Sequence, residues 1–164
     1  MKCKSPLFRQ ISKSSFRSRR TLGRAYQVNV LDAEHVEEAI IEQVQEFNGR
    51  LDIFVANAGI PWTQGPMIEG DLSHFHKVVS TDFDGTYYCA KAAGKIWRRQ
   101  KQEGTDAFGN KLEGFTYGSF IATASMSGSI VNIPQLQAAY NAAKSAVTHL
   151  CIRHSISNSE DLAN

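Results

Sequence analysis

The sequence predicts an α/β protein in which helices flank a parallel β-sheet. Two short apolar runs, at residues 51–56 and 120–124, have the composition of parallel strands that are buried on both faces. Segments whose apolar residues recur with the spacing of an amphipathic helix alternate with these runs along the chain. This alternation favours a parallel sheet of the Rossmann type.

The first predicted elements lie between residues 25 and 49. Residues 25–30 alternate apolar and polar side chains, which fits a short strand. Asp32 can cap a helix after it, because a carboxylate accepts hydrogen bonds from the free N–H groups of a first helical turn. Asn48 and Gly49 are expected to end this helix. Its apolar positions recur at Val36, Ala39, Ile40, Val44 and Phe47.

A loop and a long helix are predicted after the strand at 51–56. The loop covers residues 59–70, where proline and glycine break regular structure. Ser73 or Asp71 can cap the helix that follows. We expect this helix to run to about Arg99, with a bend near residues 82–85.

The last third of the chain contains an excursion, the second strand and a final helix. Residues 100–118 are polar and rich in glycine, so we predict an exposed excursion there. A loop at 128–137 follows the second strand. The final helix is expected to open near residue 138 and to run through Tyr140 and Leu150.

These elements divide the chain into three parts. Residues 1–24 are basic and predicted to be disordered, residues 25–154 form a partial Rossmann-type domain, and residues 155–164 form a polar tail that is expected to fray. The first 31 residues hold eight lysines or arginines and no acidic residue. That composition is also typical of a mitochondrial transit peptide or a nucleic-acid-binding arm. We favour the disordered segment and a cytoplasmic protein, with mitochondrial import as the alternative.

Composition excludes several classes of function. The chain has 164 residues, 42% hydrophobic residues and a net charge of +2, which is typical of one globular domain and gives no sign of a nucleic-acid partner. Cys3, Cys89 and Cys151 are odd in number and widely spaced, which argues against a disulfide framework or a metal site. Apolar runs stay below the roughly 18 residues that would suggest a membrane span.

The segment YNAAK at 140–144 carries the strongest chemical signal. Tyr140 and Lys144 lie four residues apart on a predicted helix and therefore share one face. A nearby cation stabilises a phenolate, so the pair suits general acid–base chemistry on a carbonyl. Ser125 follows one predicted strand and Asn57 follows the other. Because ligands bind at the carboxyl ends of parallel strands, we expect these residues to lie at one edge of the sheet.

These motifs resemble those of the short-chain dehydrogenase/reductase superfamily. ANAG at 56–59 is similar to its N-N-A-G element, TASMSG at 123–128 to its serine segment, and YNAAK to its Y-x-x-x-K motif. The stretch IVNIPQLQAAYNAAK at 130–144 resembles the fungal branch of NADP-dependent polyol, sorbose and carbonyl reductases, which includes mannitol dehydrogenase-like proteins. The resemblance extends from about Tyr26 to about Leu150.

The resemblance implies an oxidoreductase that interconverts a ketone, such as a ketose, and a secondary alcohol, such as a polyol, with NADP(H). Tyr140 would donate the proton and Ser125 would hydrogen-bond the carbonyl oxygen. Lys144 would stabilise the phenolate and hold the nicotinamide ribose. NAD remains an alternative cofactor. A ketoreductase of a fungal biosynthetic pathway would share the same motifs.

Further site residues follow from the same resemblance. Asn57, Ala58 and Gly59 would lie along the adenosine half of the cofactor. Asp82 stands where the superfamily usually carries an asparagine, and could accept a hydrogen bond from a proton-relay water. The remaining cofactor-binding candidates are Asn29, in place of an aspartate that binds adenine, and Lys91. The long helices would form the contacts of a homo-oligomer.

One part of the family pattern is missing from the sequence. The glycine-rich turn T-G-x-x-x-G-x-G, which receives the pyrophosphate, does not occur in it. In the strand order 3-2-1-4-5-6 the predicted strands are the third, fourth and fifth, so residues 25–30 should lack a neighbouring strand. We therefore predict an incomplete sheet that lacks the first two strands and the C-terminal strands. The alternative to an enzyme is a non-catalytic remnant or a partner-binding fragment. We expect this chain alone to be poorly soluble and to show no NADPH-dependent ketone reduction.

Overall fold

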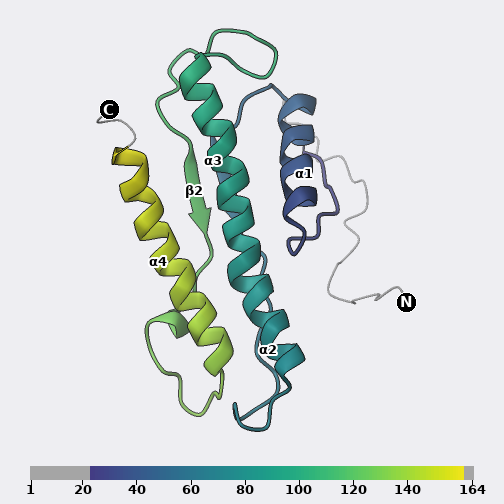
Figure 1. The fold of residues 1–164 in the computed structure, drawn as a ribbon, viewed down its shortest axis with the longest axis vertical. Coiled ribbons are helices and arrows are strands. Elements are labelled where there is room, and N and C mark those ends of the chain that lie inside the picture. The colour runs from purple at the N-terminus through teal and green to yellow at the C-terminus, as the bar shows by residue number, and fades with distance from the viewer. Residues whose placement is uncertain (1–22, 161–164) are drawn as a thin grey trace.

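The computed structural model describes residues 23–160, with side chains described through residue 152. Two parallel strands pair with each other, and helices form the layer beside them (Figure 1). The elements in chain order are α1 (Ala33–Glu46), β1 (Ile53–Ala56), α2 (Leu72–Val79), the π-helical turn η1 (Ser80–Asp84), α3 (Gly85–Glu103), β2 (Ser119–Ala122), the 3₁₀ turn η2 (Met126–Gly128) and α4 (Ala138–Glu160).

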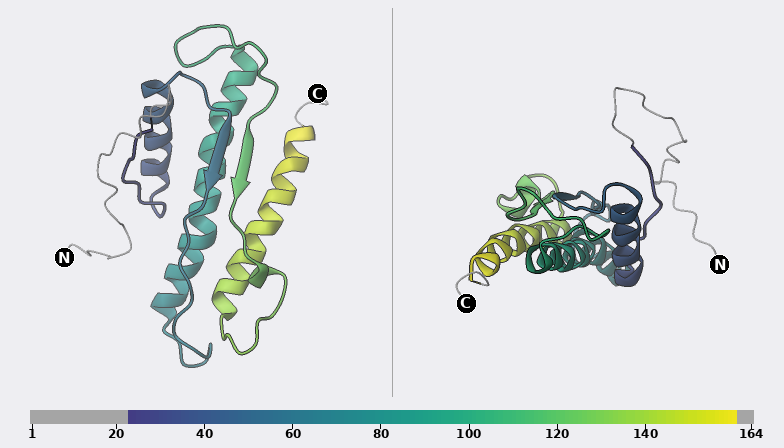
Figure 2. Two further views of the ribbon diagram at one scale, coloured as in Figure 1. Left: turned by 180° about the vertical axis from the view of Figure 1, so that it is seen from behind. Right: turned by 90° about the horizontal axis from the view of Figure 1, so that it is seen from above.

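The architecture confirms an incomplete α/β fold. Seen from above, α1, α3 and α4 form one layer, and from behind no helix of the described part of the chain covers the strands (Figure 2). Ile53 and Val55 of β1 and Ile121 of β2 are correspondingly exposed. The core lies on the other face, where apolar residues of α1, β1 and α3 pack together: Val36, Ile40, Val44, Ala56, Cys89 and Ala92.

The prediction of a strand at residues 25–30 is wrong. The backbone there is irregular, although Val28 packs against the core and Val30 packs against Gly85 of α3. A strand needs a neighbour to satisfy its backbone groups, and within the described part of the chain β1 pairs with β2 alone. A cavity of about 600 Å³ lies between this segment, α1 and the free edge of β1. It lies where the family strand order predicts missing strands.

Where the sequence predicted a bend in the long helix, the structure has the π-helical turn η1, referred to as the bend of the long helix. Asp71 occupies the N-cap position of α2, whereas Ser73 lies inside its first turn. Beyond the bend, α3 continues four residues past Arg99 and ends at Gly104, which adopts the left-handed conformation that glycine tolerates best.

The excursion and the last helix also differ from expectation in extent. Residues 104–118 are organised around Asp106, whose carboxylate accepts the N–H groups of Phe108 and Asn110. Helix α4 continues to Glu160, beyond the predicted boundary at 154 and into the tail expected to fray, because the segment to residue 160 holds no glycine or proline. The other segments predicted to be disordered or frayed, 1–22 and 161–164, lie outside the described residues.

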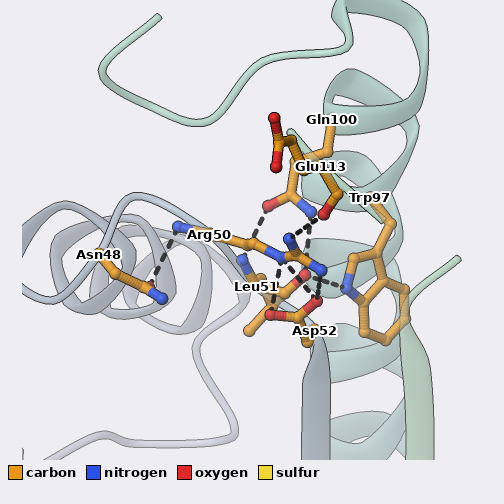
Figure 3. Close-up of polar contacts among 7 residues, drawn as sticks. All are labelled: Asn48, Arg50, Leu51, Asp52, Trp97, Gln100 and Glu113. Carbon is orange, nitrogen blue, oxygen red and sulfur yellow. Dashed lines mark hydrogen bonds and ion pairs between the residues drawn. The ribbon is translucent and has the colours of Figure 1, made fainter. Parts of the chain in front are cut away.

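Polar side chains close the amino end of β1 (Figure 3). The amide of Gln100, fully buried, accepts the N–H of Leu51 at 2.8 Å and donates to its carbonyl oxygen at 2.9 Å. The indole N–H of Trp97 donates to the same oxygen. Arg50 pairs with Asp52 in a bidentate contact. Gln100 thus serves Leu51 as a neighbouring strand would.

The described helices include none that is long and apolar enough to cross a membrane.

Candidate active site

The carboxyl ends of β1 and β2 meet at one edge of the sheet. The N–H of Thr123 donates to the carbonyl oxygen of Ala56 at 2.9 Å, which extends the pairing by one residue beyond β2. The Thr123 hydroxyl donates to the amide oxygen of Asn57 at 2.6 Å. Asn57 and the loop that carries Ser125 are therefore joined across this edge.

Lys144 reaches this edge from α4. Its ammonium Nζ donates to the carbonyl oxygen of Thr123 at 3.0 Å and lies 2.9 Å from Oδ1 of Asp82. Both residues are buried, with 4% of Lys144 and 0% of Asp82 exposed. A charge buried to this degree is tolerated when it is paired, and these two groups pair with each other.

Asp82 lies in η1 and connects this turn to two other segments. Its second carboxylate oxygen, Oδ2, accepts the N–H of Ile60 at 3.0 Å, and its backbone carbonyl accepts the Thr86 hydroxyl at 2.8 Å. The carboxylate thus joins the bend of the long helix to α4 and to the loop after β1.

Tyr140 lies one helical turn before Lys144 on the same face of α4. The distance from Nζ of Lys144 to the centroid of the tyrosine ring is 5.7 Å. The ring is half-buried against a small apolar cluster that contains Trp62, Val78 and Ala139. This packing holds the phenol close to the ammonium, as the four-residue spacing predicted.

Ser125 is placed by the turn that it caps. Its hydroxyl oxygen accepts the N–H of Ser127, which fixes the start of η2. Gly128, at the end of η2, lies directly against the backbone of α4, where an added Cβ would come within 2.8 Å of the carbonyl carbon of Lys144. The hydroxyl of Ser145 donates to the carbonyl oxygen of Gly128. These contacts bind the serine loop to the helix of Tyr140 and Lys144.

A half-exposed serine, a phenol and a buried ammonium thus lie near the carboxyl ends of the two parallel strands. A family model described as Enoyl-(Acyl carrier protein) reductase matches residues 10–154. The chain belongs to the short-chain dehydrogenase/reductase family. The membership predicted from the motifs is confirmed.

Two curated relatives in this family come from fungi. The chain is 59% identical over 128 residues to the L-xylulose reductase of Hypocrea jecorina, a match that covers 78% of this chain and 44% of the relative. It is 51% identical to a probable NADP-dependent mannitol dehydrogenase of Yarrowia lipolytica, and this match covers 77% of this chain and 40% of the relative. The chain therefore spans less than half the length of these relatives.

A solved structure supports the fold. The NADPH-dependent 3-quinuclidinone reductase from Rhodotorula rubra aligns with a TM-score of 0.61 and 38% sequence identity, over 77% of this chain and 41% of that one. The match extends the family relationship to the arrangement of helices and strands.

Two of the predicted cofactor-binding residues lie elsewhere in this short-chain dehydrogenase/reductase. The amide oxygen of Asn29 accepts the N–H of Leu31 within the turn before α1. Lys91 is exposed on α3 and lines a separate surface hollow with Tyr87 and Tyr117. The structure brings neither residue to Asp82 and Lys144.

The sequence reasoning missed two residues of this site. Thr123 holds Lys144 through its backbone oxygen, and its position near the end of a predicted strand was the available signal. Gly128 lies in the quoted serine segment, but its close approach to α4 depends on the packing of distant segments. Gly59, which we predicted to lie along the cofactor, lies against the Asp82–Lys144 pair, a neighbour that the sequence did not indicate.

The buried thiol of Cys89 lies outside this site. Burial raises the pKa of the Cys89 thiol to about 11, so this side chain stays protonated and serves the core. Within residues 23–160 no three metal-binding side chains of the histidine, cysteine or carboxylate type come together.

Proposed function

We propose that this site interconverts a ketone, such as a ketose, and a secondary alcohol, such as a polyol, with NADP(H). The observation that carries the proposal is the ammonium of Lys144, which is buried at the strand edge, fixed by two partners and 5.7 Å from the Tyr140 ring. The names of two relatives, an L-xylulose reductase and a probable mannitol dehydrogenase, support this substrate class.

The proposed roles follow from the charge that develops on the substrate. The cofactor, when bound, supplies the hydride that reduces the carbonyl carbon. The Tyr140 hydroxyl gives its proton to the carbonyl oxygen and becomes a phenolate, which Lys144 stabilises until solvent returns a proton. The Ser125 hydroxyl donates a hydrogen bond to the same oxygen.

The residues present fit one end of a nicotinamide cofactor. Lys144 has three N–H donors, of which one donates to Thr123 while the ammonium pairs with Asp82, so a donor remains for a ribose hydroxyl. The exposed turn of Asn57, Ala58 and Gly59 offers a surface along which a nucleotide can lie.

The described residues do not account for the pyrophosphate. The N-terminus of α1 is already capped by the carboxylate of Asp32, which accepts the N–H groups of Glu34 and His35 and would repel a phosphate. We propose NADP rather than NAD as the cofactor, because one relative is named a probable NADP-dependent mannitol dehydrogenase. We also propose that Asn29 and Lys91 contact the cofactor. Asp82 is proposed to belong to the same catalytic group as Tyr140 and Lys144.

A chimera tests this proposal without depending on the length of the chain. The matched 128-residue stretch replaces its counterpart in the L-xylulose reductase of Hypocrea jecorina. We expect oxidation of NADPH in the presence of L-xylulose, and Tyr140→Phe should lower kcat by about 10²-fold or more because the proton donor is lost. The 164-residue chain assayed alone is expected to show no turnover.

Tyr117→Phe is the matched control, because this exposed tyrosine lies in the excursion beside Lys101. It should leave kcat unchanged. A chimera that folds and binds NADPH but reduces no ketose would refute the proposal and favour the non-catalytic alternative. Full turnover by the Tyr140→Phe variant would show that the proton comes from another group.

We also propose that α3 and α4 form the contact of a homo-oligomer. A hollow of about 730 Å³ lies along α3 and reaches Leu150 of α4, with Tyr87 and Arg98 in its lining. Light scattering on the chimera measures the oligomeric state, and Arg98→Glu should shift it toward the monomer. An unchanged state would remove this surface from consideration.

A further inference from the structure

We propose that Asp82 is a positioning residue that holds the ammonium of Lys144 by a direct ion pair, and that Gly59 is glycine because this pair fills the space of its side chain. The inference rests on the proposed function for the role of Lys144. It differs from a role for Asp82 in binding a relay water, because the carboxylate contacts Lys144 itself.

Both oxygens of the carboxylate are committed. Oδ1 forms an ion pair with Nζ of Lys144 at 2.9 Å and has no hydrogen-bond partner among the described residues. Oδ2 accepts the N–H of Ile60 at 3.0 Å. Since Asp82 is fully buried, its charge depends on Lys144 for compensation, and the reverse holds for Lys144.

Gly59 provides the space for this pair. A Cβ at Gly59 would lie 2.6 Å from Oδ1 of Asp82 and 3.0 Å from Nζ of Lys144. The backbone of Gly59 is not in the left-handed region, so its conformation does not demand glycine. The turn after β1 thus does two things: Gly59 leaves room for the two charges, and the next residue, Ile60, donates the N–H that orients the carboxylate.

The result is a clamp that fixes Lys144 from two sides. Thr123 holds Nζ at the end of β2, and Asp82 holds it from the bend of the long helix. Held by one hydrogen bond and one ion pair, the ammonium keeps a constant place relative to the Tyr140 ring on the same helix. A neutral amide at position 82 can keep a hydrogen bond but cannot compensate the charge.

Lysine labelling of the 164-residue chain tests the clamp without any assay of activity. Reductive methylation with formaldehyde and a borane, read by peptide mass spectrometry, compares Lys144 with the exposed Lys91 in one sample. In the unsubstituted protein Lys144 should react at least about tenfold more slowly than Lys91, because its nitrogen is buried and paired. Equal rates in this folded protein would overturn the proposal before any variant is made.

Two variants then separate the clamp from simple burial. Asp82→Asn and Gly59→Ala should each raise the labelling rate of Lys144 toward that of Lys91. Asp84→Asn, on the same turn, and Gly23→Ala, where an added Cβ meets nothing within 4 Å, are the matched controls and should leave the rate unchanged. Unchanged Lys144 protection in a folded Asp82→Asn variant would refute the ion pair.

The same variants in the chimera distinguish this inference from the proposed function. Asp82→Asn and Gly59→Ala should lower kcat more than they raise KM for the ketose, because they displace the ammonium rather than the substrate. If the chimera is inactive while Lys144 protection still depends on Asp82, the clamp stands and the proposed function fails. If the chimera turns over and neither kcat nor protection responds to Asp82→Asn, the clamp fails and the function stands.

Discussion

The two ends of the β1–β2 pair bury polar groups in different ways. At the amino end, Gln100 and Trp97 satisfy the backbone of Leu51 with neutral hydrogen bonds. At the carboxyl end, Asp82 and Lys144 bury two opposite charges. The first network is closed, since the N–H and C=O of Leu51 both have partners, whereas the second contains Lys144, which we propose contacts the cofactor.

The difference predicts how strongly each end of the strand pair depends on its side chains. A neutral network that lacks one member leaves one unsatisfied dipole, but a buried ion pair that lacks one member leaves an uncompensated charge. The carboxyl end should therefore tolerate substitution less than the amino end, although both are equally buried.

Asp82→Ala should have the largest effect on stability. It leaves the Lys144 ammonium buried beside a single carbonyl oxygen, which should lower the free energy of unfolding by about 3–5 kcal/mol. Urea denaturation followed by circular dichroism measures this loss. Asp84→Ala serves as the control on the same turn, and a loss no greater than in that control would mean that the pair contributes nothing.

Gln100→Ala should have the second-largest effect on stability. It removes the acceptor for the Leu51 N–H and opens a cavity, so we expect a loss of about 2–4 kcal/mol. The protection of Lys144 from methylation should not change, because the substitution lies at the opposite end of the strand. If labelling of Lys144 rises as well, the two ends are coupled and the comparison is wrong.

Gly128→Ala should have a smaller effect on stability and a specific effect on the site. Its Cβ would press against the α4 backbone at Lys144, so we expect a loss of about 1–3 kcal/mol as η2 moves away from the helix. In the chimera this movement should lower kcat by displacing Ser125. Normal kcat in a destabilised variant would show that the serine loop keeps its place without this contact.

Substitution of Asp106 should have the smallest effect on the free energy of unfolding, and only at acidic pH. The hydrogen bond from the Asn110 side chain, with further help from backbone N–H groups and Arg99, holds the pKa of Asp106 below its usual range. Its contribution to stability is therefore complete above the unfolded pKa of about 3.9 and is lost as the pH falls through the lower folded value. Asp106→Asn should flatten the stability profile below about pH 4, and an identical acid profile in both proteins would contradict this.

The sequence predicted what depends on local spacing. The shared face of Tyr140 and Lys144 follows from helical periodicity, and the position of Asn57 at the same sheet edge as the loop of Ser125 follows from the ends of parallel strands. The bend at η1 was visible as a break in the apolar pattern.

The features that the sequence did not predict depend on contacts between distant segments. Residues 25–30 have a pattern that fits a strand, but a strand forms only beside another strand. Gln100 lies in a polar stretch and gave no sign that it would be fully buried against Leu51. The space that Gly59 leaves for two charges exists only once α4 and the bend of the long helix pack together.

The pairing of residue 53 with residue 119 also has a consequence for the order of folding. The two strands are joined by a long stretch that contains α2 and α3, so a large loop must close before the sheet gains any hydrogen bond. Helices gain their contacts locally and form faster. Stopped-flow circular dichroism should therefore record the formation of α3 before the sheet assembles. The backbone of β1 should stay unpaired until β2 forms its hydrogen bonds with it.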